Sequence, residues 1–224
     1  MIRTLLDVLF PPRCAGCGHR GAWICESCTA RFSRLAPSRC PTCSRPTASS
    51  SVCFGCRREA PAFSVLYCAF LFEDPLRSAI HRLKYAGARH LAEPLANQVI
   101  RSIGPLPRFD AVLPVPLHPN RRAHRGFNQS DLLARSIGRS LGVPVFEDRL
   151  RRVKDTPSQV GLKATERWQN VQGAFLADLG DLVNASILLV DDVATTGSTL
   201  RAAALALREA GAGRVDALVL ARAL

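Results

Sequence analysis

The stretch SILLVDDVATTGSTL, residues 186–200, decides the fold of this chain. It opens with a continuous apolar run, which is typical of a strand covered on both faces in a parallel sheet. The hydroxyl-rich residues that follow predict a turn, and residues 198–211 predict a helix that ends at Gly211. Asp191 and Asp192 stand between strand and turn. Because ligands gather beyond the carboxyl ends of parallel strands, this stretch also predicts a ligand site.

Strands and helices alternate along the rest of the chain. The patterns predict strands at 64–72, 109–117, 143–150, 186–192 and 214–224, and helices at 74–87, 89–104, 128–142 and 198–211. Asp74 is expected to cap the first of these helices, with Pro75 at its first position. The alternation predicts an α/β domain, a mostly parallel sheet flanked by helices. The long polar stretch 154–173 has no period, which is typical of a functional loop.

Eight of the nine cysteines form four Cys-x-x-Cys pairs, all in the first quarter of the chain. Each pair aims two sulfurs at one point, and two pairs complete a tetrahedral shell around a zinc ion. Short connections favour sites built from neighbouring pairs, although spacing alone leaves an interleaved arrangement open. The predicted ligands are Cys14, Cys17, Cys25 and Cys28 for one zinc ion and Cys40, Cys43, Cys53 and Cys56 for the other. Cys68, in an apolar strand, is expected to be a buried thiol.

The cysteine-rich segment is predicted to be a small domain, residues 1–60, followed by an α/β domain of residues 61–224. With so few large aliphatic side chains, fewer than about 60 residues cannot build a sufficient core without metal. A disulfide framework would need an oxidising compartment, and the N-terminal sequence resembles no signal peptide. Residues 5–10 are expected to form a short amphipathic helix instead. No stretch reaches the roughly 20 apolar residues of a membrane span, so a cytoplasmic location is expected.

The formal net charge is +12, and nearly all of the positive charge is Arg. Such a charge favours an anionic partner: nucleotide, nucleic acid or a membrane surface. A genome rich in Arg codons would give the same number, so charge alone names no ligand.

The turn after the aspartates has the composition of a phosphate receptor. A turn that enters a helix presents free N–H groups and a partial positive charge, and Gly197 lets the backbone approach a ligand closely. The hydroxyls that can add hydrogen bonds belong to Thr195, Thr196, Ser198 and Thr199. Asp191 and Asp192 would repel a phosphate but accept hydrogen bonds from vicinal hydroxyls. A phosphate beside a diol describes ribose 5-phosphate. The plainer alternatives are an ordinary helix cap and carboxylates that bind Mg²⁺ alone.

Other phosphate loops fit this stretch poorly. A Walker loop needs a Lys after its second Gly, and none is present here. A dinucleotide fingerprint needs three glycines opening a helix, whereas Gly211 and Gly213 follow one.

The order of apolar residues, two acids and ATTGST resembles the binding motif for phosphoribosyl pyrophosphate (PRPP) of type I phosphoribosyltransferases. The resemblance implies that Asp191 and Asp192 contact the ribose hydroxyls, and that Ala194 to Thr199 wrap the 5-phosphate. With LKYAG, VPLHPNRRAHRGFNQS, QVGLKATERWQNVQGAF and the cysteine-rich segment, essentially the whole chain is similar to the ComF family of competence-associated proteins. The expected fold is therefore the type I phosphoribosyltransferase fold with a small N-terminal double zinc ribbon.

The same resemblance implies further site residues. The loop PVPLHPNRRAHRGFNQ corresponds to the one that receives pyrophosphate, and a cis Val115–Pro116 bond would suit it. Its candidate ligand-binding residues are Val115, Pro116, Arg121, Arg122 and Arg125, and a solvated basic loop is the alternative. Residues 154–173 match the hood that closes over PRPP, where Lys163 and Arg167 would neutralise the departing pyrophosphate. Lys84 is a further candidate, although a solvent-facing Lys on a helix is common.

Two classes of function fit these features. The first is a Mg²⁺-dependent phosphoribosyltransferase that uses PRPP, with an acceptor that the sequence does not reveal. The second is a non-catalytic factor in DNA uptake and natural transformation that keeps the PRPP pocket, binds single-stranded DNA or recruits a DNA-translocation helicase. Single-strand binding needs basic residues interleaved with stacking aromatics, which the cysteine-rich segment offers in Trp23, Phe32 and Phe54 among its arginines. Trp23 is expected to pack in the small zinc core.

Overall fold

A computed structural model describes residues 11–155 and 171–224, and its centre is a parallel sheet. The strands are β1 (Leu66–Tyr67), β2 (Phe70–Leu71), β3 (Ala111–Pro114), β6 (Ser186–Ala194) and β7 (Arg214–Arg222). Their order is β1-β7-β6-β3, with β2 also paired to β7, and every pairing is parallel. The predicted α/β class and parallel sheet are therefore confirmed.

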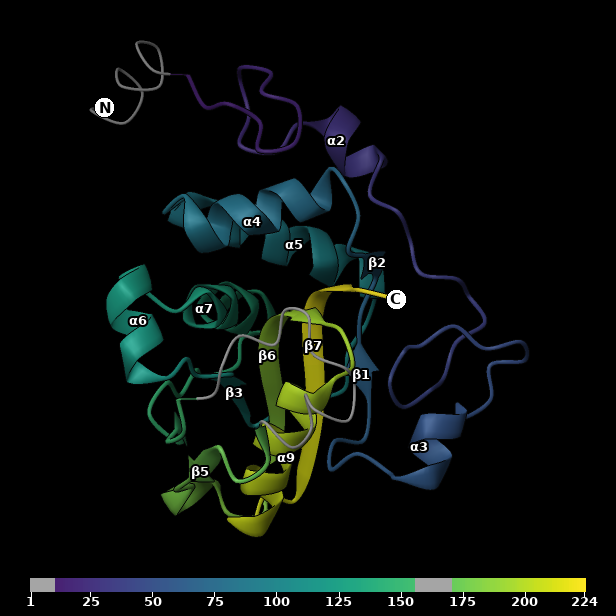
Figure 1. The fold of residues 1–224 in the computed structure, drawn as a ribbon, viewed down its shortest axis with the longest axis vertical. Coiled ribbons are helices and arrows are strands. Elements are labelled where there is room, and N and C mark those ends of the chain that lie inside the picture. The colour runs from purple at the N-terminus through teal and green to yellow at the C-terminus, as the bar shows by residue number, and fades with distance from the viewer. Residues whose placement is uncertain (1–10, 156–170) are drawn as a thin grey trace.

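Helices cover both faces of the sheet (Figure 1). The helices of one layer are α4 (Leu76–Tyr85), α5 (Ala92–Ile103) and α7 (Gln129–Leu141), and α9 (Ser198–Glu209) lies on the opposite face. Alternate residues of β6 serve the two layers, since Ile187 and Leu189 join the core under α9, whereas Leu188 and Val190 join the other. All four side chains are fully buried. The continuous apolar run is explained by this two-sided burial.

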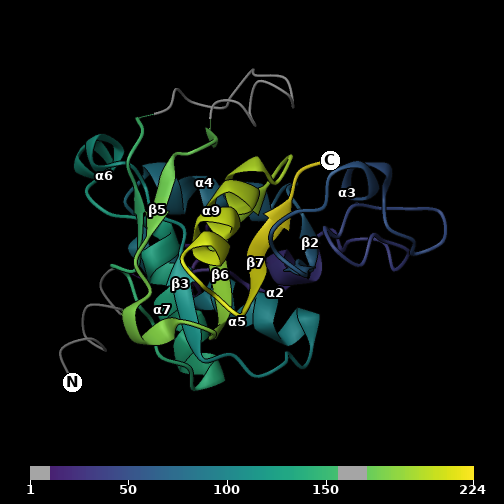
Figure 2. The same ribbon diagram turned by 90° about the horizontal axis from the view of Figure 1, so that it is seen from below.

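The remaining described elements are short. They are α2 (Glu26–Ala30), α3 (Phe54–Arg58), η1 (Arg89–Leu91), α6 (Pro119–Arg125), β4 (Leu150–Arg152), β5 (Phe175–Ala177) and η2 (Gly180–Leu182). Strands β4 and β5 pair antiparallel apart from the main sheet, and Figure 2 shows β5 beside α9. They flank the long polar stretch that begins at 154, of which 156–170 lie outside the described residues. The helix expected at 5–10 also lies outside them.

Two of the predicted strands do not have the predicted bounds in the structure. The strand at 64–72 is broken into β1 and β2, because the Ala69 carbonyl accepts a hydrogen bond from the Leu35 N–H (2.9 Å) of the cysteine-rich segment instead of continuing the ladder. Of the strand predicted at 143–150, Val145 forms one bridge to Val112, and Leu150 begins β4. Pro144, which has no N–H to donate, precedes that bridge.

Helix α4 begins later than predicted, at Leu76, with Pro75 as its N-cap and not at the first helical position. The Asp74 carboxylate still accepts hydrogen bonds from the Ser78 N–H (3.1 Å) and hydroxyl (2.5 Å) in the first turn. Among the described residues the one cis peptide bond is Asp74–Pro75, so Val115–Pro116, for which a cis bond would have been unsurprising, is trans. The loop that contains Val115 also includes a helix, α6, that the sequence did not predict.

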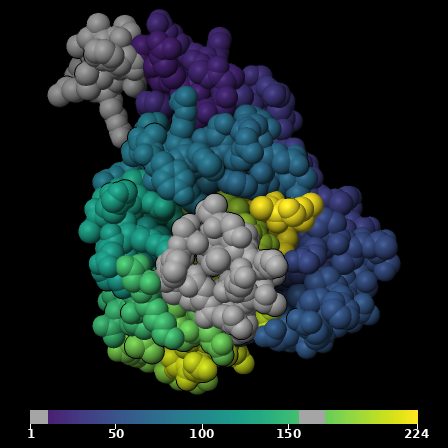
Figure 3. All heavy atoms as spheres, in the orientation of Figure 1, coloured from purple at the N-terminus to yellow at the C-terminus, as the bar shows by residue number. Residues whose placement is uncertain are grey.

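The cysteine-rich segment packs on the α/β domain at two separate places (Figure 3, purple and blue). Around the first four cysteines, Ala15 and Phe32 join the core beneath α4, and the Trp23 ring lies 3.7 Å from the His90 ring, centroid to centroid. Trp23 is 38% exposed and packs against η1, so the expectation that it packs in the small zinc core was wrong. The second four cysteines lie beside β1 and β7, where the Leu66 N–H donates to the Thr42 carbonyl (2.7 Å). None of the described helices has the length and apolar character needed to cross a membrane.

Candidate PRPP site and zinc centres

The two aspartates lie in the last part of β6, not beyond it. The sequence predicted that the strand ends at Asp192, but pairing with β7 continues through Val193 and Ala194. Asp192 is therefore 3% exposed, whereas Asp191 is partly exposed. The adjacent carboxylates meet different partners, although both line the same cavity.

Asp192 forms an ion pair with a lysine from α4. Its Oδ2 lies 2.9 Å from Lys84 Nζ, and the two side chains are only 5% and 18% exposed. Burial lowers the pKa of Lys84, but the Asp192 carboxylate outweighs it, so the pKa is raised and the ammonium stays charged. Lys84 thus faces the site and is not a solvent-facing helix residue.

Asp191 accepts a hydrogen bond from the Ser130 hydroxyl of α7 (3.0 Å) and from the Asp192 N–H (2.9 Å). Its pKa is raised to about 7, first by burial and then by the charge of Asp192, with Lys84 acting in the opposite direction. Two carboxylates so close to each other create a place that favours hydroxyl donors or a cation.

The turn after β6 has the geometry of an anion receptor. Gly197 has a φ of 82° and precedes the first residue of α9, so a left-handed glycine opens a helix of 12 residues. The Thr196 hydroxyl lies 2.8 Å from the Ser198 hydroxyl and accepts from the Ser198 N–H at 3.3 Å. A Cβ on Gly197 would meet no atom within 4 Å, so that side of the turn is open. The helix start combines free N–H groups with a partial positive charge.

Helix α6 places two of the three candidate arginines at the same cavity. Arg121 and Arg125 line it, and the Arg125 guanidinium lies 5.1 Å from the centroid of the Tyr85 ring and donates to the Gln129 side chain. Arg122 points elsewhere, since its Nη2 lies 3.5 Å from the Asp131 carboxylate of α7. Arg121 and Arg125 therefore line the cavity, and Arg122 does not.

One cavity of about 460 Å³ unites most of the predicted residues. From the predicted set, its lining includes Lys84, Val115, Pro116, Arg121, Arg125, Asp191, Asp192, Ala194, Thr195, Gly197, Ser198 and Thr199. Thr196 lines a second cavity, on the other side of the turn. Lys163 and Arg167 lie outside the described residues.

Sequence reasoning missed Arg152, at the end of β4. This side chain is only 7% exposed and lines the cavity, with its guanidinium 5.5 Å from the centroid of the Phe175 ring. Burial, followed by the charge of Arg121, lowers its pKa. The signal that could have found it is the alternation in Leu150 and Arg152, which puts a basic residue at an inward position.

The eight paired cysteines form two groups, each built from neighbouring pairs. Within each group the sulfurs lie within 4.8 Å of one another, and the interleaved arrangement is excluded. The Cys17–Cys25 and Cys43–Cys53 sulfurs are each 3.6 Å apart, close to the roughly 3.8 Å edge of a tetrahedron with zinc–sulfur bonds of about 2.3 Å. Backbone N–H groups of Cys25 and Cys53 donate to Cys14 and Cys40 sulfurs at 3.4 Å. These are closed, structural zinc sites, as predicted. Cys68 belongs to neither group and is buried.

Comparison with known proteins agrees with this geometry. Residues 5–57 match the family model of the double zinc ribbon domain, and residues 126–224 match that of the phosphoribosyl transferase domain. The fold and site thus define a phosphoribosyltransferase-type domain that carries a double zinc ribbon.

Relatives that match this chain over most of its length identify its family. The chain is 35% identical to the DNA utilization protein YhgH of Salmonella typhi over 209 residues, which cover 90% of this chain and 91% of that protein. It is 32% identical to competence protein F of Haemophilus influenzae over 179 residues, 76% and 78% of the two chains. It is 28% identical to competence protein ComFC of Bacillus subtilis, over 89% and 84%. The chain belongs to the ComF family, which these proteins represent.

Proposed function

We propose that this chain binds PRPP and transfers its phosphoribosyl group to an acceptor. The observation that carries the proposal is the placement of Asp191 and Asp192 beside the start of α9 in one cavity of about 460 Å³. A diol receptor next to a phosphate receptor matches the two ends of a ribose 5-phosphate. The basic side chains of Arg121 and Arg152 across the same cavity suit the pyrophosphate.

In the proposed complex, the ribose hydroxyls donate to the two carboxylates and the 5-phosphate accepts from the N–H groups of residues 195–199. Transfer breaks the bond between C1 and the pyrophosphate oxygen, and pyrophosphate leaves with the electron pair. The acceptor then supplies the electron pair of the new bond to C1. The protein contributes positioning and charge and no covalent nucleophile. Lys163 and Arg167 of the hood are proposed to balance the leaving group.

The residues present also suit Mg²⁺ as the partner of PRPP. Mg²⁺ prefers oxygen ligands and is commonly held by one or two carboxylates together with substrate phosphates. Asp191 and Asp192 supply those carboxylates; burial, and then the charge of Asp192, raises the pKa of Asp191, and a cation beside it would favour its ionised form. When bound, the cation would neutralise charge on the pyrophosphate.

A turnover assay tests the proposal. Labelled PRPP is incubated with the full chain, Mg²⁺ and either free bases or single-stranded DNA, and pyrophosphate release is measured. Acceptor-dependent release supports the transferase. Tight PRPP binding without release, measured by calorimetry, supports a binder that keeps the pocket, and no PRPP binding contradicts both.

The affinity for ribose 5-phosphate is expected to depend on pH through Asp191. Its pKa of about 7 is above the ordinary 3.8, so the folded protein holds this proton more tightly than the unfolded chain does. Ionising Asp191 therefore costs stability as pH rises from about 4 to 7. The ionised form, however, accepts the stronger hydrogen bonds. We expect affinity to rise by about tenfold from pH 6 to 8, measured by calorimetry without divalent cations.

Asp191→Asn is the matched control for this pH dependence. Titration of the ligand phosphate changes the affinity of the wild type and of Asp191→Asn alike. Only the part of the pH dependence that the substitution removes is therefore due to Asp191. Equal slopes in the two proteins would contradict the assignment.

We further propose that the chain acts on DNA in the cytoplasm, in DNA uptake or utilisation. The support is the names of its relatives, which are a DNA utilization protein and competence proteins. The zinc ribbon offers a matching surface at α3, where the Phe54 ring is 70% exposed and the Arg58 guanidinium lies 5.9 Å from its centroid. An exposed aromatic ring with Arg57 and Arg58 beside it is suited to stacking a base of a single strand. A DNA-translocation helicase remains a proposed partner.

Phe54→Ala is expected to weaken single-stranded DNA binding by about tenfold, because one base–aromatic stack contributes about 1–3 kcal/mol. Fluorescence anisotropy with a labelled oligonucleotide at two salt concentrations gives the affinity. Val183→Ala, which removes another exposed apolar side chain on the α/β domain, is the control. Unchanged affinity of Phe54→Ala at low salt would exclude this surface.

A further inference from the structure

The inference concerns Arg222, the last residue of β7, which is 1% exposed. Its Nη1 donates to the carbonyl of Cys43, a ligand of the second zinc centre, at 2.7 Å. Its Nη2 donates to the carbonyl of Thr195, in the turn proposed to hold the 5-phosphate, at 3.3 Å. One buried guanidinium therefore joins a zinc centre to the phosphate turn.

The zinc side of this connection is anchored independently. The hydroxyl of Ser44 donates to the Leu66 carbonyl at 2.6 Å, and the Leu66 N–H donates to the Thr42 carbonyl at 2.7 Å, so the knuckle that contains Cys43 is docked on β1. A zinc ion with four thiolates carries a net negative charge. That charge gives a reason for a guanidinium to be buried here, because a buried cation needs a counter-charge.

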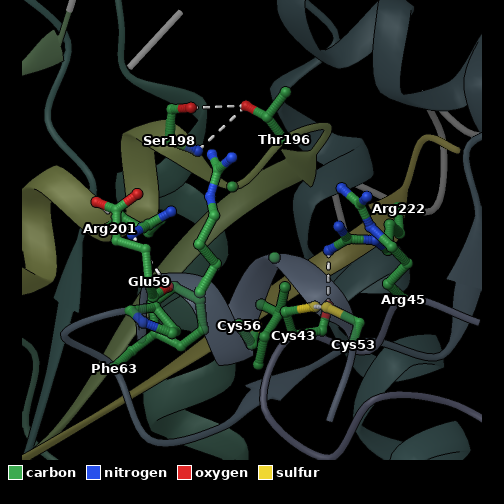
Figure 4. A pocket seen from close by; sticks show the side chains of 15 residues that line it. Cys43, Arg45, Cys53, Cys56, Glu59, Phe63, Thr196, Ser198, Arg201 and Arg222 are labelled. Carbon is green, nitrogen blue, oxygen red and sulfur yellow. Dashed lines mark hydrogen bonds and ion pairs between the residues drawn. The ribbon is translucent and has the colours of Figure 1, made fainter. Parts of the chain in front are cut away.

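On the ligand side of this connection, the phosphate turn separates two cavities. Gly197 and Ser198 line both the large cavity and a second one, of about 290 Å³, on the side of the second zinc centre. Figure 4 shows Thr196 and Ser198 on one side of this second cavity and Cys43, Cys53 and Arg222 on another. Arg222 thus holds the turn from the side opposite to the proposed ligand. In the sheet it stands opposite Ala194, the residue before Thr195.

We infer that Arg222 is a positioning residue through which the second zinc centre, and not the first, holds the phosphate turn in its binding conformation. This inference rests on the proposed function for its consequence, the affinity for ribose 5-phosphate. Its structural part is independent of any ligand. Beside the first zinc centre, Ala15 and Phe32 join instead the core that includes α4, and Trp23 lies against His90, away from the turn.

Hydrogen exchange by mass spectrometry tests the structural part on the full chain. Cys53→Ser and Cys25→Ser remove the third ligand of the second and the first centre, and zinc analysis should show one ion lost from each. We expect amide exchange in residues 194–201 to rise about tenfold in Cys53→Ser and Arg222→Met, and to stay unchanged in Cys25→Ser. Arg222→Lys keeps the charge and one donor group, so it should lie between wild type and Arg222→Met.

Calorimetry with ribose 5-phosphate tests the consequence. Arg222→Met should weaken binding about tenfold, in keeping with a lost buried hydrogen bond. The double variant Arg222→Met/Cys53→Ser should be no weaker than the weaker single variant, because both act through one connection. Tyr67→Phe removes a 3.1 Å hydrogen bond to Asp216 elsewhere on β7 and controls for general destabilisation.

The possible results distinguish a failure of this inference from a failure of the proposed function. Equal exchange in Cys25→Ser and Cys53→Ser, or additive losses in the double variant, would overturn the inference. If Arg222→Met does not fold, the two cysteine variants and Arg222→Lys still decide it. A wild-type chain that binds no ribose 5-phosphate would contradict the proposed function, while the exchange data would still decide whether Arg222 connects the zinc centre to the turn.

Discussion

Asp191→Asn/Asp192→Asn is expected to weaken binding of ribose 5-phosphate by at least a hundredfold. Each carboxylate is proposed to accept a charge-assisted hydrogen bond from a ribose hydroxyl, and such a bond contributes about 1.5–3 kcal/mol. Two of them correspond to about 3–6 kcal/mol, which is two to four orders of magnitude in affinity. Calorimetry at pH 8, where Asp191 is mostly ionised, is the measurement.

Inorganic phosphate is the matched ligand control, because it has no diol. Removing two negative charges beside the phosphate turn should leave its affinity unchanged or raise it. Asp192→Asn also leaves the buried Lys84 without its ion-pair partner, so the melting temperature is recorded and Lys84→Met/Asp192→Asn serves as a second background. Losses for inorganic phosphate as large as those for the sugar phosphate would show that the substitutions damage the turn and not the diol receptor.

Removing both zinc ions is expected to unfold the cysteine-rich segment. Structural zinc contributes about 10–16 kcal/mol of apparent binding free energy in zinc-finger peptides, so a small segment without it loses its fold. In a Trp168→Phe background, Trp23 is the only tryptophan left of the two. Because its ring packs against His90, chelation should shift its emission to longer wavelength as two zinc ions per chain are released.

Cys68→Ser is the control for zinc removal, since this buried thiol belongs to neither zinc group. Its zinc content should equal that of the wild type. Release of both ions with an unchanged emission spectrum and unchanged circular dichroism would contradict a structural role for the metal.

The sequence was sufficient for features that depend on local pattern. The burial of β6 on both faces follows from an uninterrupted apolar run, and the two zinc centres follow from Cys-x-x-Cys spacing with short connections. The position of the phosphate turn follows from its glycine and hydroxyl residues, since these directly favour a left-handed turn before a helix.

What the sequence could not predict depends on contacts between distant segments. Strand 64–72 is interrupted because a zinc-ribbon backbone group pairs with Ala69, and nothing in its own composition shows this. The approach of Lys84 to Asp192, 108 positions away, and the inward position of Arg152 arise from helix and strand packing. An arginine at the end of a strand is expected to lie at the surface. Arg222 is buried instead, because the two carbonyls that accept its hydrogen bonds belong to Cys43 and Thr195, in other segments of the chain.

The alternation of side chains in β6 has a consequence for how this site tolerates change. Asp191 meets α7 through Ser130, and its neighbour Asp192 meets α4 through Lys84. Deleting a single residue of β6 ahead of them would shift the register, and because adjacent residues of a strand face opposite ways, it would turn each carboxylate away from its present partner. The site thus depends on a count of residues as much as on their identity. Insertions are better accommodated in the connections between elements, where added length costs little free energy.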